Sequence, residues 1–107
     1  MIIEFLSFHV PLAAQPAFLT QDAAIWTPAL ATSPGFLGKE VWRERDTPEQ
    51  INLVIRWQAQ ADWDAMDKGL LAATQLAFVA AMGTDYPVLN CTAFKAESVA
   101  VAQQPLA

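Results

Sequence analysis

The ten residues Ser33–Trp42, SPGFLGKEVW, constrain the fold of this chain more than any other stretch. Pro34 disfavours the α-helical conformation at Ser33, and Gly35 can adopt the positive φ of a type II turn, so a preceding helix has to end here. Beyond the turn, residues 36–45 alternate roughly as a β-strand does. The stretch therefore joins a helix to a strand and fixes the order of the elements around it.

The residues before this joint predict one strand and one helix. Residues 2–10 are rich in β-branched and aromatic types and are too short before a proline for a stable helix, which predicts a strand. Both faces of this strand are largely apolar, so both should be covered. From about Gln15 the apolar residues recur with a helical period, and Asp22 is assigned to the solvent side. Pro28 inside this helix predicts a kink or a looser final turn.

The residues after the joint predict two more strands, a second helix and a last strand. The polar loop 46–50 connects two antiparallel strands, and Gly83 ends the helix that follows them. The predicted elements are the strands 36–45 and 51–57, the helix 60–82 and the strand 87–94.

The complete order is β-α-β-β-α-β, the ferredoxin-like α+β arrangement. It predicts a four-stranded antiparallel sheet with two helices on one face, in a single domain over residues 1–95. Because the first strand is apolar on both sides, the open face of the sheet should pack against a second copy of the chain. Residues 96–107 form a tail that is either disordered or paired with the second subunit.

The amino-acid composition limits which classes of partner and which cellular compartment are expected. Apolar residues make up 54% of the 107 residues and charged residues 16%, an excess of apolar surface that favours a homodimer. No apolar run approaches the roughly 18 residues of a membrane span. A net charge of −5 with only six scattered Lys and Arg argues against nucleic acid. The apolar N-terminus lacks the basic region of a signal peptide, and the single Cys91 fits a reducing cytosol, so a cytoplasmic location is predicted.

Three separated motifs resemble a known group of proteins. They are IWTPAL at 25–30, PGFLGKEVW at 34–42 and LVIRW at 53–57. Together they resemble an uncharacterised family of small proteins in the dimeric α/β barrel, or antibiotic-biosynthesis-monooxygenase-like, superfamily, over about residues 1–95. The resemblance implies a homodimer. Superfamily members that oxidise polyketide quinones or degrade haem work in a pocket between sheet and helices, typically with an Asn on strand one, a Trp on strand three and a His on helix two.

Only part of that set has a counterpart in this sequence. Trp57 matches the Trp position, and Ser7 stands near the Asn position. The helix over residues 60–82 contains no His. The resemblance therefore does not favour a haem-degrading monooxygenase, and it leaves open whether the chain is an enzyme.

The residues themselves supply a short set of site candidates. His9 is the only histidine, and it is either a partly exposed structural residue at a strand end or a proton carrier in a pocket. Cys91 has no basic neighbour in sequence and is interpreted as a core thiol. Catalytic candidates are His9, Ser7 and Trp57. The predicted ligand pocket consists of Phe5, Ser7, His9, Trp26 and Trp57.

The aspartates of residues 62–67 and Arg56 are expected to have structural roles. Asp62, Asp64 and Asp67 form a solvated first helical turn, because residues two apart do not share a helix face. Arg56 is expected to pair with Glu4 or Glu40 near the dimer face. One His and one Cys do not make a metal site, so neither a metal nor a cofactor is predicted.

Three functions remain open at this point. The first is a homodimer that binds a small apolar or aromatic molecule between sheet and helices. The second is a cofactor-independent monooxygenase-like enzyme, and the third is a structural or interaction module without a ligand.

Overall fold

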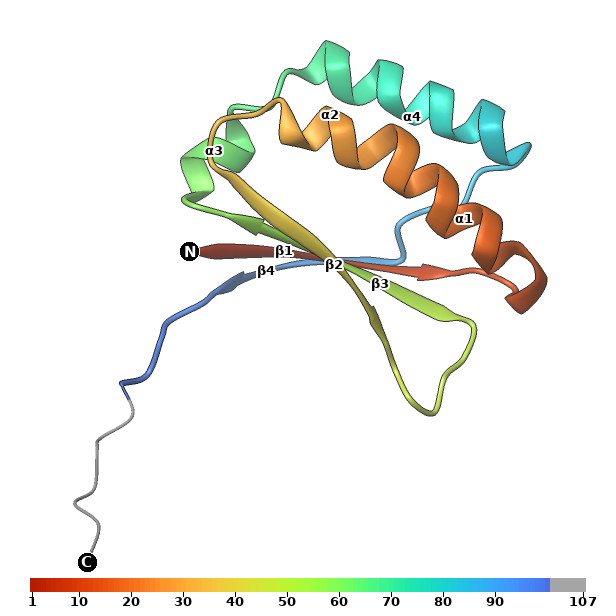
Figure 1. Cartoon of the computed structure of the whole chain (residues 1–107), viewed down its shortest axis with the longest axis horizontal. Coiled ribbons are helices and arrows are strands. Elements are labelled where there is room, and N and C mark those ends of the chain that lie inside the picture. Colours follow the sequence, from red (N-terminus) through yellow and green to blue (C-terminus); the bar gives the residue numbers. More distant parts are fainter. Residues whose placement is uncertain (101–107) are drawn as a thin grey trace, which may run out of the picture.

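A four-stranded antiparallel sheet carries helices on one of its faces (Figure 1). The computed structural model describes residues 1–100; part of the predicted tail, 101–107, lies outside the described residues. The strand order is β2-β3-β1-β4. The strands are β1 Ile2–His9, β2 Phe36–Arg43, β3 Gln50–Trp57 and β4 Asn90–Lys95. This confirms the predicted ferredoxin-like arrangement.

The pairing register decides which side chains face the helices. Leu6 of β1 lies opposite Leu53 of β3, and Phe5 lies opposite Val54. Leu6 and Leu53 pack toward the helices, whereas the ring of Phe5 contacts Trp42 on the other side. Even-numbered residues of β1 therefore face the helices together with odd-numbered residues of β3, and the remaining positions face away.

The first helical region has three consecutive parts. A 3₁₀ turn, η1 Leu12–Ala14, leads into α1 Gln15–Gln21, then the π-helical segment η2 Asp22–Trp26, then α2 Thr27–Ala31. The backbone N–H of Thr27 bonds to the carbonyl of Asp22, five residues earlier. Since Pro28 has no N–H to donate to Ala24, this wider turn absorbs the missing bond. The irregularity predicted at Pro28 is thus a π segment just before it.

The second helical region is two helices, not the single one predicted over 60–82. They are α3 Gln60–Asp64 and α4 Lys68–Met82. The carboxylate of Asp67 accepts a 2.7 Å bond from the backbone N–H of Leu70, which caps the start of α4. A new N-cap requires an extended residue, so the helix has to break here. Gly83, with φ 75°, ends α4 as predicted.

The turn between α2 and β2 depends on Gly35. Its φ is 85°, a left-handed conformation that favours glycine. A Cβ at this position would also collide with the side-chain carboxyl of Asp62 in α3. The carbonyl of Gly35 accepts a 2.8 Å bond from the N–H of Gln58. The turn therefore holds the start of β2 against the end of β3 and the start of α3.

The apolar core lies between the sheet and the helices in two clusters. One contains Phe8, Val10, Phe18, Ile51, Leu53 and Phe78, and the other contains Leu30, Ile55, Trp57 and Met66. Cys91 is not in this core; the prediction of a core thiol is wrong, because Cys91 is exposed on the edge strand β4. Among residues 1–100, no helix has the length and apolar character needed to cross a membrane.

Candidate functional site

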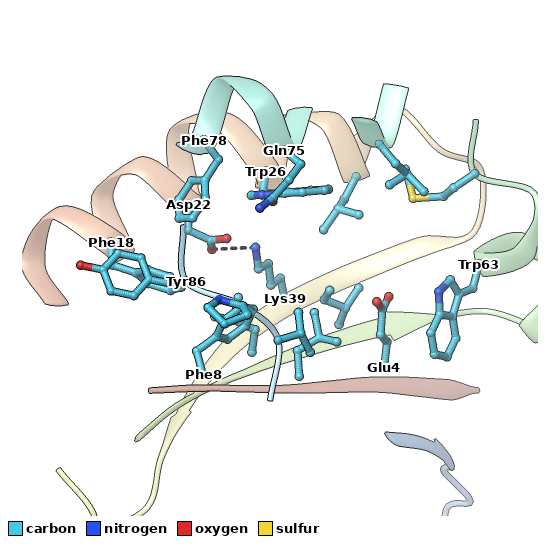
Figure 2. Close-up of a pocket in the computed structure, with 18 of the residues that line it drawn as sticks. Glu4, Phe8, Phe18, Asp22, Trp26, Lys39, Trp63, Gln75, Phe78 and Tyr86 are labelled. Carbon is cyan, nitrogen blue, oxygen red and sulfur yellow. Dashed lines mark ion pairs between the residues drawn. The ribbon is translucent and has the colours of Figure 1, made fainter. Parts of the chain in front are cut away.

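A cavity of about 520 Å³ separates the sheet from the helices (Figure 2). Its floor comes from β1 and β3, and its roof comes from the first helical region and α4. The apolar walls are Leu6, Phe8, Leu53 and Ile55 below and Phe18, Trp26, Leu30, Leu71 and Phe78 above. Both core clusters contribute to these walls. A cavity of this size and character suits a small, mainly apolar molecule.

An ion pair crosses the cavity wall from η2 to β2. The ammonium of Lys39 lies 2.6 Å from Asp22 Oδ2, and each side chain is only 7% exposed. Lys39 Nζ also donates to Thr27 Oγ1 at 3.4 Å. Burial raises the pKa of the Asp22 carboxyl, and the Lys39 ammonium opposes part of that rise. The π turn brings Asp22 and Thr27, five residues apart, to the same ammonium.

Glu4 adds a second carboxylate. It extends from β1 toward the helices, as Figure 2 shows. Its Oε1 accepts a 3.1 Å hydrogen bond from the indole N–H of Trp57, whose side chain is fully buried. Burial raises the pKa of the Glu4 carboxyl, while the indole bond and the charge of Lys39 oppose the rise. Glu4 is therefore a more basic carboxylate than an exposed glutamate, and it lies in a largely apolar cavity.

The amino-acid sequence matches one known protein family. The family described as antibiotic biosynthesis monooxygenase matches residues 1–69, well over half of the chain. The chain belongs to this family. No curated protein matches the sequence.

Solved structures place this family member in the same fold. SnoaB from Streptomyces nogalater, a cofactor-independent oxygenase solved as a mutant, is 19% identical with a TM-score of 0.66, over 92% of this chain and 94% of that one. The haem degrader MhuD from Mycobacterium tuberculosis, solved with two haems in its active site, is 21% identical with a TM-score of 0.63, over 94% and 99%. A protein from Agrobacterium tumefaciens is 16% identical with a TM-score of 0.66, over 89% and 92%. At these identities the likeness shows the fold alone.

The residues predicted to form the ligand pocket lie on both faces of the sheet. Trp26 lines the cavity, and Trp57 lies on the same face behind Glu4. Phe5, Ser7 and His9 occupy odd positions of β1 and face away from the helices. The structure thus brings Trp26 and Trp57 to the cavity side and leaves the other three outside it.

Ser7 and His9 have partners on their own face. Ser7 Oγ donates to Asn52 Oδ1 at 2.9 Å, and both residues are buried. His9 Nε2 lies 3.3 Å from Glu49 Oε2, and both side chains are largely exposed. The two residues border a second, shallower hollow of about 330 Å³ with Asn90. Neither reaches Trp57, so these three catalytic candidates do not form one constellation.

The polar residues of the cavity were missing from the sequence-based site. Asp22, assigned to solvent, is buried, and its position four residues after the buried Phe18 places it on the inner face of the helix. Glu4 is a lone charge in an apolar strand, at a position that shares its face with Leu6 and Phe8. The four-residue spacing in the helix and the two-residue spacing in the strand are the sequence signals that place both carboxylates on the cavity side.

The remaining candidates have structural partners. Arg56 Nε donates to Glu40 Oε1 at 2.6 Å, which confirms one of its two expected pairings, whereas Glu4 lies on the opposite face. Burial chiefly raises the pKa of the Cys91 thiol, and the charge of Glu4 adds to the rise. Across the described part of the chain, no group of three His, Cys, Asp or Glu is placed to hold a metal ion.

Proposed function

We propose that this protein binds a small aromatic molecule in the cavity between the sheet and the helices. The observation that carries the proposal is the cavity itself, about 520 Å³ with largely apolar walls. Its size falls within the roughly 300–1,000 Å³ of small-molecule sites. Aromatic rings of Phe18, Trp26 and Tyr86 stand around it (Figure 2). Flat aromatic ligands pack well against such rings.

The test compares two leucine-to-tryptophan variants of α4, one that places a larger side chain in the cavity and one that makes the same change on the exposed surface. Leu71 and Leu76 both belong to α4, but Leu71 lines the cavity and Leu76 is exposed. Naphthalene serves as the probe, and binding is followed by its fluorescence. Leu71→Trp should weaken binding by about tenfold or more, because the indole occupies the ligand's space. Leu76→Trp should leave binding unchanged; equal binding by the two variants, or none by the unmodified protein, contradicts the proposal.

A second candidate function is cofactor-independent oxygenation. Two observations favour it: the chain belongs to the antibiotic biosynthesis monooxygenase family, and Trp57 contacts a cavity carboxylate. The similar structure of SnoaB is that of a cofactor-independent oxygenase. The test is oxygen uptake with hydroquinone or anthrone substrates, which should fall in Trp57→Phe. Uptake that is absent, or that Trp57→Phe leaves intact, argues for binding without turnover.

We also propose that two copies associate through the face of the sheet that the helices leave open. Phe5 contacts Trp42 and Phe94 there, with ring centroids 6.4 and 6.0 Å apart. Trp42 is 46% exposed and Phe94 51% exposed, which is unusual for large aromatic side chains. The charges on this face are paired, since Arg56 bonds to Glu40. A face that is apolar and internally neutralised suits a second copy of itself.

Sedimentation velocity at micromolar concentration tests the dimer. Phe94→Glu should shift the protein toward monomer, because it buries a charge in the interface. Leu12→Glu changes a residue of similar exposure on η1 and should leave the dimer intact. A monomeric unmodified protein contradicts the proposal. The pairing of residues 96–107 with the second subunit and the cytoplasmic location stay predictions.

A further inference from the structure

The two carboxylates of the cavity differ in how their charge is balanced. Asp22 has the ammonium of Lys39 at 2.6 Å. Glu4 has a neutral indole at 3.1 Å, and no cation lies within salt-bridge distance of it among the described residues. Glu4 is half-buried, and a carboxylate withdrawn from water without a contacting cation is costly to ionise. Glu4 is therefore the group in this cavity that gains most from a ligand able to share or donate a proton.

Glu40 provides an internal comparison for Glu4. Both are strand residues that accept a 3.1 Å bond from a tryptophan indole, Glu4 from Trp57 and Glu40 from Trp42. Glu40 lies on the open face, where the indole bond from Trp42 and the bond from Arg56 lower its pKa. Burial raises the pKa of Glu4 instead. On the open face, the charge of Glu40 is thus balanced by Arg56. On the face toward the helices, Glu4 has only the indole of Trp57 among the described residues and can accept a hydrogen bond from a further donor.

The second oxygen of Glu4 is the one available to a ligand. Trp57 donates to Oε1, and within residues 1–100 no side-chain donor bonds to Oε2. The carboxylate lines the cavity, so a ligand atom can approach it from the side of the helices.

Lys39 supplies positive charge that acts on the Glu4 carboxylate. Two of its N–H groups bond to Asp22 and Thr27, and a third remains. Its charge acts on Glu4, and it stands between Asp22 and Glu4 in the view of Figure 2. The other ionisable groups around the cavity, or coupled by charge to Glu4, are Asp22 on η2, Asp64 on α3, Lys68 on α4, Asp85 and Tyr86 after α4, and Cys91 on β4.

We propose that Glu4 accepts the proton of a hydroxyl group on the aromatic ligand, and that Lys39 stabilises the resulting aryloxide. The inference rests on the proposed function, because it requires an aromatic molecule in the cavity. In the step, the ligand's O–H bond breaks, an O–H bond forms at Glu4, and the bonding electron pair stays on the ligand oxygen. The total charge of the complex does not change. No oxidant or other reactant is consumed.

Burial and charge both act in this direction, and they suffice most readily for a ligand whose hydroxyl is much more acidic than an ordinary phenol, with its pKa of about 10. Moving the negative charge from a carboxylate without a contacting cation to a ring that delocalises it, near an ammonium, lowers the cost of burying that charge. A carboxyl group whose pKa lies above its ordinary value is also a better proton acceptor once ionised. A cationic amine would satisfy Glu4 alone, but the ammonium of Lys39 on the same cavity wall would repel it.

The probe for this step is 4-nitrophenol, whose neutral and ionised forms absorb at different wavelengths. At a pH where Glu4 is ionised in the free protein and the free probe is mainly protonated, the bound probe should show the phenolate band. Calorimetry in two buffers of different ionisation enthalpy should detect no net proton release, because the proton stays on Glu4. Nitrobenzene, which lacks the hydroxyl, serves as the matched neutral ligand.

Glu4→Gln keeps an acceptor for the Trp57 indole but removes the proton acceptor. In this variant bound 4-nitrophenol should stay protonated and bind about tenfold more weakly, while nitrobenzene binds as before and verifies the fold. Glu40→Gln, the same change on the other face, should bind 4-nitrophenol with the same affinity and the same phenolate band as the unmodified protein. A phenolate band that persists in Glu4→Gln, or its absence in the unmodified protein while nitrobenzene binds, overturns this inference. Failure of both ligands to bind the unmodified protein overturns the proposed function as well.

Discussion

Removing one member of the Asp22–Lys39 pair should destabilise the fold far more than removing both. The two charges are 2.6 Å apart and almost fully buried, so at an effective dielectric constant of about 20 their attraction is about 6 kcal/mol. Desolvation offsets much of this attraction. Removing one partner leaves the other charge buried and unpaired, at a cost of about 3–5 kcal/mol.

The variants are Lys39→Met, Asp22→Asn and the double variant. Methionine retains most of the lysine stem, and asparagine retains the shape of aspartate, so each change removes charge with little loss of packing. Each single variant should lose about 3 kcal/mol or more of the free energy of unfolding, measured in urea at neutral pH. The double variant should recover most of the loss, since replacing both members of a buried pair is often close to neutral.

The exposed pair Arg45–Asp46 is the control. Its atoms are 3.1 Å apart, but its side chains are 90% and 69% exposed. Asp46→Asn should change the free energy of unfolding by less than about 1 kcal/mol. If Lys39→Met costs no more than this control, or if the two single losses simply add in the double variant, then the buried pair is not coupled and the reasoning fails.

Three further predictions concern single residues. Because burial raises the folded-state pKa of Glu4 above its ordinary 4.5, stability should fall as the pH rises from about 4.5 through the raised value, and Glu4→Gln should reduce that fall in urea titrations at several pH values. Gly35→Ala should lower the melting temperature more than Gly83→Ala, because both glycines have positive φ but only Gly35 would collide with Asp62; equal effects would contradict the close approach. Asp67→Ala should cost about 1 kcal/mol through loss of the α4 cap, measured by urea unfolding, and an unchanged value would mean that the cap is not used.

The order of the elements could be predicted because local chemistry sets it. The Pro34-Gly35 turn, Gly83 and the change of hydrophobic period all act within a few residues of the boundaries they mark. The break before α4 was missed because the pattern of apolar residues continues across it. There the N-cap formed by Asp67 outweighs helix propensity, and only a search for capping residues would have found it.

The site could be predicted only in part, because the faces of β1 are both apolar. Alternation correctly separated Phe5, Ser7 and His9 from Glu4, but it did not say which set the helices cover. That depends on the register with β3, where Ile2 lies opposite Trp57. Such pairing joins residues 41 to 55 positions apart, and a shift of one residue would exchange the two faces. The sequence therefore placed Trp57 with His9 and Ser7, although the sheet separates them.

The register also gives Trp57 a different role from that of a residue in direct contact with a ligand. Its side chain is fully buried, and its indole N–H bonds to Glu4, which itself lines the cavity. Trp57 therefore positions the carboxylate through Oε1 and leaves Oε2 without a side-chain donor among residues 1–100. We infer that a cavity with apolar walls and one carboxylate lacking a contacting cation would select ligands by their ability to give up a proton as well as by shape. On this basis the chemistry of the cavity depends on Glu4 more than on any residue that the sequence motifs alone pointed to.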